Sequence, residues 1–303
     1  MLEGGIEVWR GGVNAWQCDQ MGHLNVRFYV AHAMEGLAGL AGALGMGSAF
    51  SPRGSATLAV SQHHIRFLKE ARVGDPLNLT AGLLEMGEDD ARTFMLLAHS
   101  GDEAPAAVVQ TSVAHVAASD GRRFPWSQSA RRCAESLRVR IPDGLGPRSL
   151  EPAAPVREPT LAEADRAGLI HYGAGAYGPE DCDVFGRVAA HRIVARMIDG
   201  AGHGFAVIRE GVGEHIGLAA VEYRIAYFEP PRAGDRYAVR AAMVQADPRR
   251  LGWCYWTFDA ETGAPLAGAR SVLVPFDLDA RKAMTLPDEA VARLRTQTVE
   301  GWA

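Results

Sequence analysis

The 303-residue sequence lacks most of the features that would assign it to a specialised class of protein. Its four cysteines, Cys18, Cys133, Cys182 and Cys254, are widely spaced and form no CxxC pair. This spacing argues against a zinc site and against a disulfide framework, and it predicts a reducing, cytoplasmic location. The N-terminus lacks a basic region followed by an apolar run, so no signal peptide is predicted. No apolar run approaches the roughly 18 residues that span a bilayer, so no membrane partner is predicted either.

Charge and composition further restrict the class of protein that the sequence can encode. The formal net charge of −5 gives no reason to expect a nucleic-acid partner. A hydrophobic content of 48% and a charged content of 22% are ordinary for a globular protein. The length fits one large domain or two domains of about 150 residues.

One short segment concentrates chemically useful side chains. It reads Cys-Asp-Gln-Met-Gly-His-Leu-Asn over residues 18–25, and so places Asp19, Gly22, His23 and Asn25 within seven positions. A strand pattern over 6–16 precedes this segment, and an amphipathic helical pattern follows it. A carboxylate in a loop that opens a helix is a plausible place for hydrolytic chemistry.

The pattern of elements predicts an antiparallel sheet with one long helix on a face. After the helix, turn residues separate four strand-like segments at 55–68, 77–86, 92–99 and 106–117. Gly36, Gly39 and Gly42 lower the helix propensity, which is tolerable if the helix lies tightly against the sheet.

The same order of elements occurs twice. Cys18–His23 aligns with Cys182–Arg187, and Ile65–Asp75 aligns with Ile225–Asp235, at offsets of 164 and 160 residues. Ala104-Pro105 matches Ala264-Pro265 at the second offset. The predicted domains are therefore residues 1–118, a Pro-rich linker with short helices at 119–169, and residues 170–303 with a tail helix.

These residues carry a resemblance to a known family. Each half resembles the hotdog fold and, more narrowly, the 4-hydroxybenzoyl-CoA thioesterase-like acyl-CoA thioesterases. Their pattern places an Asp before a Gly-His-(aliphatic)-Asn run, with a Tyr ten residues after the Asp. The matching residues are Asp19, Gly22, His23, Asn25 and Tyr29; the second half keeps Asp183 and Gly186 but has Arg187, Ala189 and Ile193.

The resemblance implies an α+β double hotdog, in which two antiparallel sheets, each wrapped on a long helix, join side by side as a pseudo-dimer. It also implies hydrolysis of an acyl-CoA thioester, with coenzyme A as part of the substrate and no further cofactor or metal. We expect a homo-oligomer of such pseudo-dimers. Two alternatives stay open: a hotdog hydratase or dehydratase that acts on acyl-CoA, and a non-catalytic acyl-CoA-binding protein.

Four residues form the predicted catalytic set. Asp19 would act as nucleophile or general base, although an Asp before a helix often only caps the helix or the turn. His23 would orient Asp19, bond the substrate carbonyl or hold the loop. Asn25 would donate to the thioester or cap the helix. The backbone N–H of Val26 would bind the oxyanion at the positive end of the helix.

Further residues are assigned around this set. Gly22 would supply a tight turn, and Tyr29 would pack with its hydroxyl near the substrate. Glu35, which aligns with Asp199, is a second carboxylate candidate. His63 and His64 alternate in a strand, and His64 is assigned to the substrate pocket. Asp183 and Arg187 would form a second site if the second half keeps one.

Overall fold

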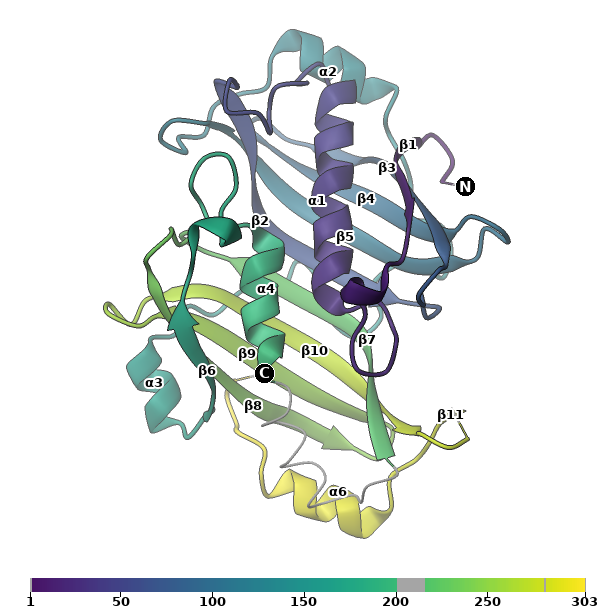
Figure 1. The fold of residues 1–303 in the computed structure, drawn as a ribbon, viewed down its shortest axis with the longest axis vertical. Coiled ribbons are helices and arrows are strands. Elements are labelled where there is room, and N and C mark those ends of the chain that lie inside the picture. The colour runs from purple at the N-terminus through teal and green to yellow at the C-terminus, as the bar shows by residue number, and fades with distance from the viewer. Residues whose placement is uncertain (1, 201–215, 281, 303) are drawn as a thin grey trace. The chain divides into compact units, whose positions relative to one another are not determined.

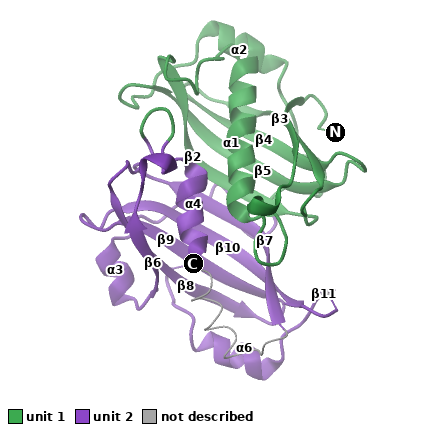
Figure 2. Ribbon diagram, viewed as in Figure 1, with its two compact units in different colours: residues 1–147, 183–186 green, residues 148–182, 187–303 purple. Residues whose placement is uncertain are grey.

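The computed structural model describes residues 2–200, 216–280 and 282–302. The chain forms two compact units (Figures 1 and 2). Unit 1 comprises residues 1–147 and 183–186, and unit 2 comprises residues 148–182 and 187–303. The division between Pro147 and Arg148 thus falls within the segment that the sequence predicts to be a linker.

Unit 1 has the predicted order of a strand, a loop, a long helix and further strands. Its strands pair antiparallel in the order β1-β3-β4-β5-β2. Its elements are β1 (Ile6–Gly12), the 3₁₀ turn η1 (Ala15–Gln17), α1 (Val26–Ala43), β2 (Ala56–Phe67), β3 (Pro76–Met86), β4 (Asp90–His99), β5 (Pro105–Ala117) and α2 (Gln128–Glu135). The prediction of an antiparallel sheet with one long helix is confirmed.

The glycines of α1 let the helix approach the sheet closely. A Cβ on Gly36 would lie 2.5 Å from a methyl carbon of Leu79, and one on Gly39 would lie 2.9 Å from Val8. Both distances are shorter than real carbon contacts, so larger residues would push α1 off the sheet. Each glycine costs up to about 1 kcal/mol of helix propensity relative to alanine. Tight packing offsets that cost, since the helix buries Leu37 and Leu40 almost completely.

The other face of the unit 1 sheet has its own core. Met95 faces α1, so the alternating residues Phe94 and Leu96 point to the opposite side of β4. They pack with Leu2 and Val139, which come from the N-terminal segment and from the segment after α2. Unit 1 therefore has two layers of apolar packing, one on each face of the sheet.

Unit 2 repeats this arrangement. Its strands pair antiparallel in the order β7-β10-β9-β8-β6, and β11 pairs with β10. Its elements are α3 (Leu161–Arg166), β6 (Ile170–Ala176), η2 (Pro179–Asp181), α4 (Ala190–Asp199), β7 (Ile216–Tyr227), β8 (Arg236–Asp247), β9 (Arg250–Asp259), β10 (Pro265–Asp277), β11 (Lys282–Ala283) and α6 (Asp288–Arg295).

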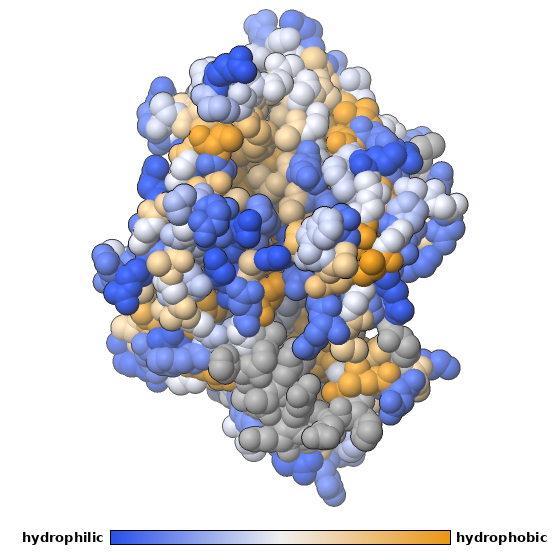
Figure 3. All heavy atoms as spheres, in the orientation of Figure 1, coloured by the Kyte–Doolittle hydropathy of each residue, from blue (hydrophilic) through white to orange (hydrophobic). Residues whose placement is uncertain are grey.

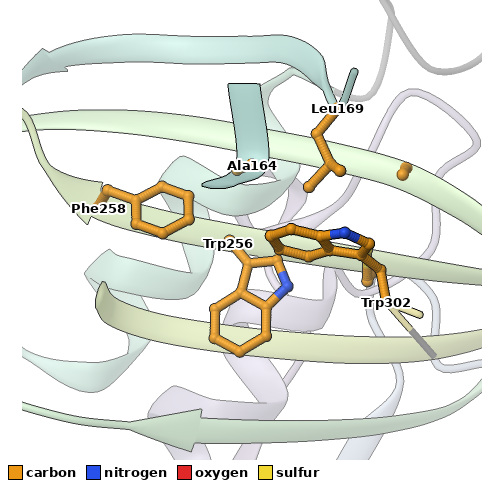
Figure 4. Close-up of a cluster of buried hydrophobic side chains, with 7 residues drawn as sticks. Ala164, Leu169, Trp256, Phe258 and Trp302 are labelled. Carbon is orange, nitrogen blue, oxygen red and sulfur yellow. The ribbon is translucent and has the colours of Figure 1, made fainter. Parts of the chain in front are cut away.

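An aromatic cluster covers one face of the unit 2 sheet. Trp256 and Phe258 of β9 pack against Ala164 of α3, Leu169 and Trp302 near the C-terminal end (Figure 4). The rings of Trp256 and Trp302 meet edge to face, with centroids 6.2 Å apart. The cluster attaches both α3 and the C-terminal segment to the sheet.

Candidate active site

The loop between β1 and α1 is held as a small hairpin. Cys18 pairs with Leu24 across it, and His23 pairs with Arg72 in the turn between β2 and β3. Gly22 has φ = +77°, a conformation that side chains larger than hydrogen rarely adopt. The glycine is therefore needed for the turn that brings Asp19 and His23 together.

The carboxylate of Asp19 shapes this turn. Its Oδ1 accepts hydrogen bonds from the N–H groups of Met21 (2.8 Å) and His23 (3.1 Å). This is an Asx-type turn, the structural role that aspartate often takes in loops. Asp19 is exposed, and within the described residues its Oδ2 makes no recorded hydrogen bond. One oxygen thus holds the loop while the other faces solvent.

A polar chain extends from His23 to the turn before β3. The His23 Nε2 lies 3.1 Å from Glu70 Oε2, and the same oxygen lies 2.6 Å from the Arg72 guanidinium. A carboxylate only accepts hydrogen bonds, so Nε2 carries the proton in this contact. Arg72 also lies 3.4 Å from Nε2, but its closer bond is to Glu70. Glu70 thus fixes the orientation of the imidazole ring.

The helix begins at Val26, directly after the loop. Asn25 is the N-cap: its Oδ1 accepts from the Arg27 N–H at 3.1 Å. The Asn25 N–H donates to the carbonyl of Gln17, and the Phe28 N–H donates to the carbonyl of Asn25. In the part of the chain that the structure describes, the Val26 N–H has no recorded hydrogen-bond partner. This N–H lies at the positive end of α1, where it can donate a hydrogen bond to a substrate oxygen.

Tyr29 lies buried beneath the loop. Its ring meets that of Phe67 edge to face, with centroids 4.9 Å apart. Burial raises the pKa of Tyr29 well above its ordinary value, and the negative charges of Asp19 and Glu70 raise it further. The phenol therefore stays protonated and cannot act as a base. Burial also raises the pKa of the Cys18 thiol, so a reactive thiolate is disfavoured there.

Glu35 lies apart from the loop. It sits nine residues after the first residue of α1, which is about 14 Å along the helix. Its Oε2 lies 2.8 Å from Nδ1 of His32, whose ring stacks on Trp9 with centroids 4.1 Å apart. The structure therefore does not bring Glu35 together with Asp19.

His63 and His64 face opposite sides of the sheet, as their alternation predicts. His63 shares the α1 side of β2 with Phe67, whereas His64 shares the other side with Arg66. Arg66 donates to carbonyl groups in the segment after α2. Burial lowers the pKa of His63 to about 3, so this imidazole is neutral at physiological pH.

A separate cavity lies at the other end of α1. It has a volume of about 310 Å³ and includes Met46, Ala49, His115 and Phe124 in its lining. Figure 3 shows a hollow edged by apolar side chains near the top of unit 1. Asp19 does not line this cavity.

The second copy of the loop keeps the turn. Asp183 Oδ1 accepts from the Phe185 N–H at 2.8 Å, and Gly186 has φ = +72°. Arg187 pairs with Arg232 through the backbone, in the way that His23 pairs with Arg72. At the start of α4, Ala189 supplies no side-chain cap.

Beneath the second loop lies a buried ion cluster. Asp181, at the position of Gln17, is only 2% exposed and accepts from the Gly178 N–H at 3.0 Å. Its carboxylate lies 3.2 Å from Arg196 and 3.8 Å from Arg192. These ion pairs fix Asp181, which lies two residues before Asp183.

Comparison with protein families shows to which family the chain belongs. The sequence model of the Thioesterase-like superfamily matches residues 13–137 and 177–294, which is well over half of the chain. The chain belongs to the thioesterase-like superfamily. The resemblance to hotdog thioesterases is thereby confirmed. Both matched segments include a motif loop, so both halves belong to the family.

Solved structures with the same fold include an acyl-ACP thioesterase from Bacteroides thetaiotaomicron. It is 11% identical, with a TM-score of 0.64 and coverage of 89% of this chain and 98% of its own. A 12:0-ACP thioesterase from Umbellularia californica is also 11% identical, with a TM-score of 0.67 and coverage of 90% and 94%. No curated protein matches the sequence. At this identity the likeness concerns the fold, which is the hotdog fold.

Neither a metal-binding cluster nor a membrane-spanning helix occurs among the described residues. Over residues 2–200, 216–280 and 282–302, His, Cys, Asp and Glu side chains do not gather in threes at metal-binding geometry. Across the same ranges, no helix is both long and apolar enough to cross a bilayer.

Sequence reasoning missed Glu70, Gln17 and His32 as neighbours of the assigned residues. Glu70 lies in the repeated Ile65–Asp75 segment, where the second copy has Pro230. An acid in only one of two aligned turns is a signal that could have singled it out. Gln17 and His32 each match a charged residue, Asp181 and Arg196, in the second copy.

Proposed function

We propose that this member of the thioesterase-like superfamily hydrolyses acyl-CoA thioesters at the loop of unit 1. The observation that carries the proposal is the hydrogen-bonded arrangement of Asp19, His23 and Glu70 beside the start of α1. The second loop has Asp183 but neither the histidine nor the glutamate. The first loop is therefore the better candidate for the reaction.

The proposed reaction uses the outward oxygen of Asp19. Asp19 Oδ2 takes a proton from water, which attacks the thioester carbonyl, or attacks the carbonyl itself to form an anhydride that water then cleaves. The Val26 N–H stabilises the negative charge that develops on the carbonyl oxygen. Collapse of the tetrahedral intermediate breaks the C–S bond and releases the thiolate of CoA, which takes up a proton.

Other residues support this step. Glu70 holds the ring of His23, and the backbone N–H of His23 donates to Asp19 Oδ1. Tyr29 remains a neutral phenol close to both carboxylates, where it can donate a hydrogen bond. Gly22 allows the loop to form. These contacts keep Asp19 Oδ2 directed away from the loop backbone.

The proposal also includes parts of the resemblance that the geometry leaves open. We place the two hotdog folds side by side as a pseudo-dimer and give the second half a supporting role, with Asp183 and Arg187 as a residual second site. The choice of CoA over acyl carrier protein, the assembly of pseudo-dimers and the cytoplasmic location stay predictions. Glu35 and His64 stay assigned to substrate binding as predictions.

The direct test is thiol release by the full-length protein from a panel of acyl-CoAs. Acyl chains from acetyl to palmitoyl and an aromatic acyl group cover the main classes. Matched acyl groups on acyl carrier protein form a second arm. We expect thiol release with at least one CoA thioester and a strong loss in Asp19→Asn. Thiol release confined to the carrier-protein arm would contradict the CoA assignment alone.

The two alternatives give different results in the same experiment. A hydratase or dehydratase would change the absorbance of an enoyl-CoA without releasing thiol. A binding protein would bind acyl-CoA tightly in calorimetry and leave the thioester intact for hours. Either result would overturn the proposed hydrolysis. Incorporation of ¹⁸O from labelled water into Asp19 would distinguish direct attack from general-base catalysis.

A further inference from the structure

One cavity of unit 2 lies along the edge of its sheet, outside the motif loop. Its volume is about 640 Å³, which is within the range of small-molecule sites. It is formed by β6, β8 and the start of α3, which are neighbours in Figure 1. The residues used below are His171, Ala174, Arg236, Ala238 and Arg240, all of which line it.

Basic side chains dominate the charge of this cavity. Arg240 is 7% exposed, and its Nε donates to Asp165 Oδ1 at 2.6 Å. Its Nη1 donates to the carbonyl of Val239 at 3.2 Å, while Nη2 makes no recorded hydrogen bond within the described residues. A guanidinium that is buried and only partly bonded retains donors for a ligand.

One further arginine and an imidazole also line the cavity. Arg236 is exposed and, in the described part of the chain, has no recorded ion-pair partner. His171 is mostly exposed, with its Nε2 3.6 Å from Asp165. Asp165 therefore faces both Arg240 and His171, and Arg236 is left uncompensated. The cavity has an excess of positive charge that an anion would balance.

The equivalent surface of unit 1 carries a neutral ion pair instead. In β1, Glu7 pairs in register with Thr80, and Arg10 pairs with Asn78. The side chains of Glu7 and Arg10 form an ion pair across this surface. In unit 2 the same register positions pair His171 with Arg240 and Ala174 with Ala238.

Comparison of the two copies thus identifies which side chains differ between the two surfaces. Replacing Arg10 and Asn78 by alanine removes two long polar side chains, and replacing Glu7 and Thr80 by His171 and Arg240 removes a carboxylate and adds a guanidinium. Both differences favour an anionic ligand. A guanidinium fork suits phosphate oxygens in particular, because it offers two parallel donors.

We propose that this cavity binds the phosphate group of a small phosphorylated ligand, with Arg240 and Arg236 as the main donors. Arg240 donates from the floor through Nη2, and Arg236 closes on the phosphate from the rim. His171 lies at the same edge. The small residues Ala174 and Ala238 leave room for the organic part of the ligand. The site is separate from the thioester reaction and does not depend on it.

The test is isothermal titration calorimetry of the full-length protein with ADP, pyrophosphate and adenosine. We expect ADP to bind, pyrophosphate to compete with it, and adenosine to bind at least tenfold more weakly, because the phosphates provide the recognition. Pyrophosphate that binds as tightly as ADP would identify the phosphates alone as the ligand. Binding of ADP no tighter than that of adenosine would overturn the proposal.

Variants test whether ADP binds in this cavity. The double variant H171E/A174R rebuilds the Glu7–Arg10 pair of unit 1 and should weaken ADP binding at least tenfold. Arg236→Gln, at an exposed position, should weaken it three- to tenfold. The matched control is Arg249→Gln, which removes an exposed arginine outside the cavity and should change the affinity less than twofold. Equal losses in Arg249→Gln and Arg236→Gln would overturn the assignment to this cavity.

Discussion

The loop at residues 18–26 and its copy at 182–190 share a backbone but not a chemistry. In both, an aspartate Oδ1 accepts from the N–H two residues later at 2.8 Å, and a glycine with positive φ follows. Asp19 and Asp183 therefore recur because the turn requires them. Repetition alone does not identify Asp19 as catalytic.

The repetition of residues 65–75 at residues 225–235 has the same structural explanation. Asp75 and Asp235 each accept the N–H of an arginine three residues earlier, Arg72 or Arg232, at 2.8 and 2.7 Å. The glycine before each aspartate has positive φ, +88° and +95°. What survived duplication is a set of turns that only Gly and Asp form easily.

What differs between the loops lies around these turns. Unit 1 has the polar chain from His23 to Glu70, half-exposed beside the helix start. The second copy has the buried cluster of Asp181 and Arg196, in which Asp181 directly precedes the loop in the sequence. One copy thus presents its polar groups to solvent, and the other uses them for packing. Four changes test this contrast.

The largest expected effect is on catalysis. Asp19→Asn should lower kcat/KM for the best acyl-CoA about a thousandfold, because the amide keeps the turn but loses the base. Asp183→Asn, the matched control in the second loop, should leave kcat/KM within twofold. Thiol release at saturating and limiting substrate measures both. Equal losses in the two variants would mean that both loops work.

The second change tests the ion cluster. Asp181→Gln, which installs the unit 1 residue, should lower the free energy of unfolding by about 2–3 kcal/mol, because it leaves Arg196 without its buried partner. This expected loss of stability is smaller than the loss for a fully buried ion pair, because Arg196 is partly exposed. Urea unfolding followed by circular dichroism measures it. In D181Q/R196H the loss should be smaller; an undiminished loss would argue against the ion pair as the cause.

The third change tests the positioning of His23. Glu70→Gln should lower kcat about tenfold with KM little changed, because a neutral amide orients the imidazole less strongly. Glu70→Asp should recover part of the loss. Lys69→Gln, which removes the exposed pair with Asp102, serves as control and should have no effect. A rise in KM with normal kcat would instead assign Glu70 to substrate binding.

The smallest effect concerns acid stability. The pKa of His63 is about 3 in the folded protein and about 6.5 when unfolded, so the unfolded state binds the proton first as pH falls. Stability is therefore lost below pH 6.5, at up to about 1.4 kcal/mol per pH unit, until the pH nears 3. His63→Leu should reduce the loss between pH 6.5 and 5.5 by about 1 kcal/mol.

The matched position in unit 2 is Tyr223. Burial raises the pKa of this phenol, so it does not titrate in acid. Tyr223→Phe should leave the slope of stability against pH unchanged over the same range. Urea midpoints at pH 6.5 and 5.5 for both variants and wild type provide the comparison, and equal slopes in wild type and His63→Leu would contradict it.

The sequence by itself determined the order of elements, because each boundary depends on local chemistry. Gly22, Gly74 and their copies mark turns, and the apolar period from Val30 to Leu44 marks α1. The motif also predicted a helix start near Asn25 and Val26, to within a few residues. The close approach of α1 through Gly36 was expected from the size of the residue alone.

Only the tertiary structure decided which side chains meet. Glu70 lies 47 residues from His23 in the sequence, and their contact depends on the turn before β3 pairing with the loop. His63 rather than His64 faces α1 because of the register of β2, and one residue of slip would reverse them. The basic cavity of unit 2 likewise depends on the pairing of β6 with β8. Local patterns specify elements, whereas sites depend on register and packing between distant segments.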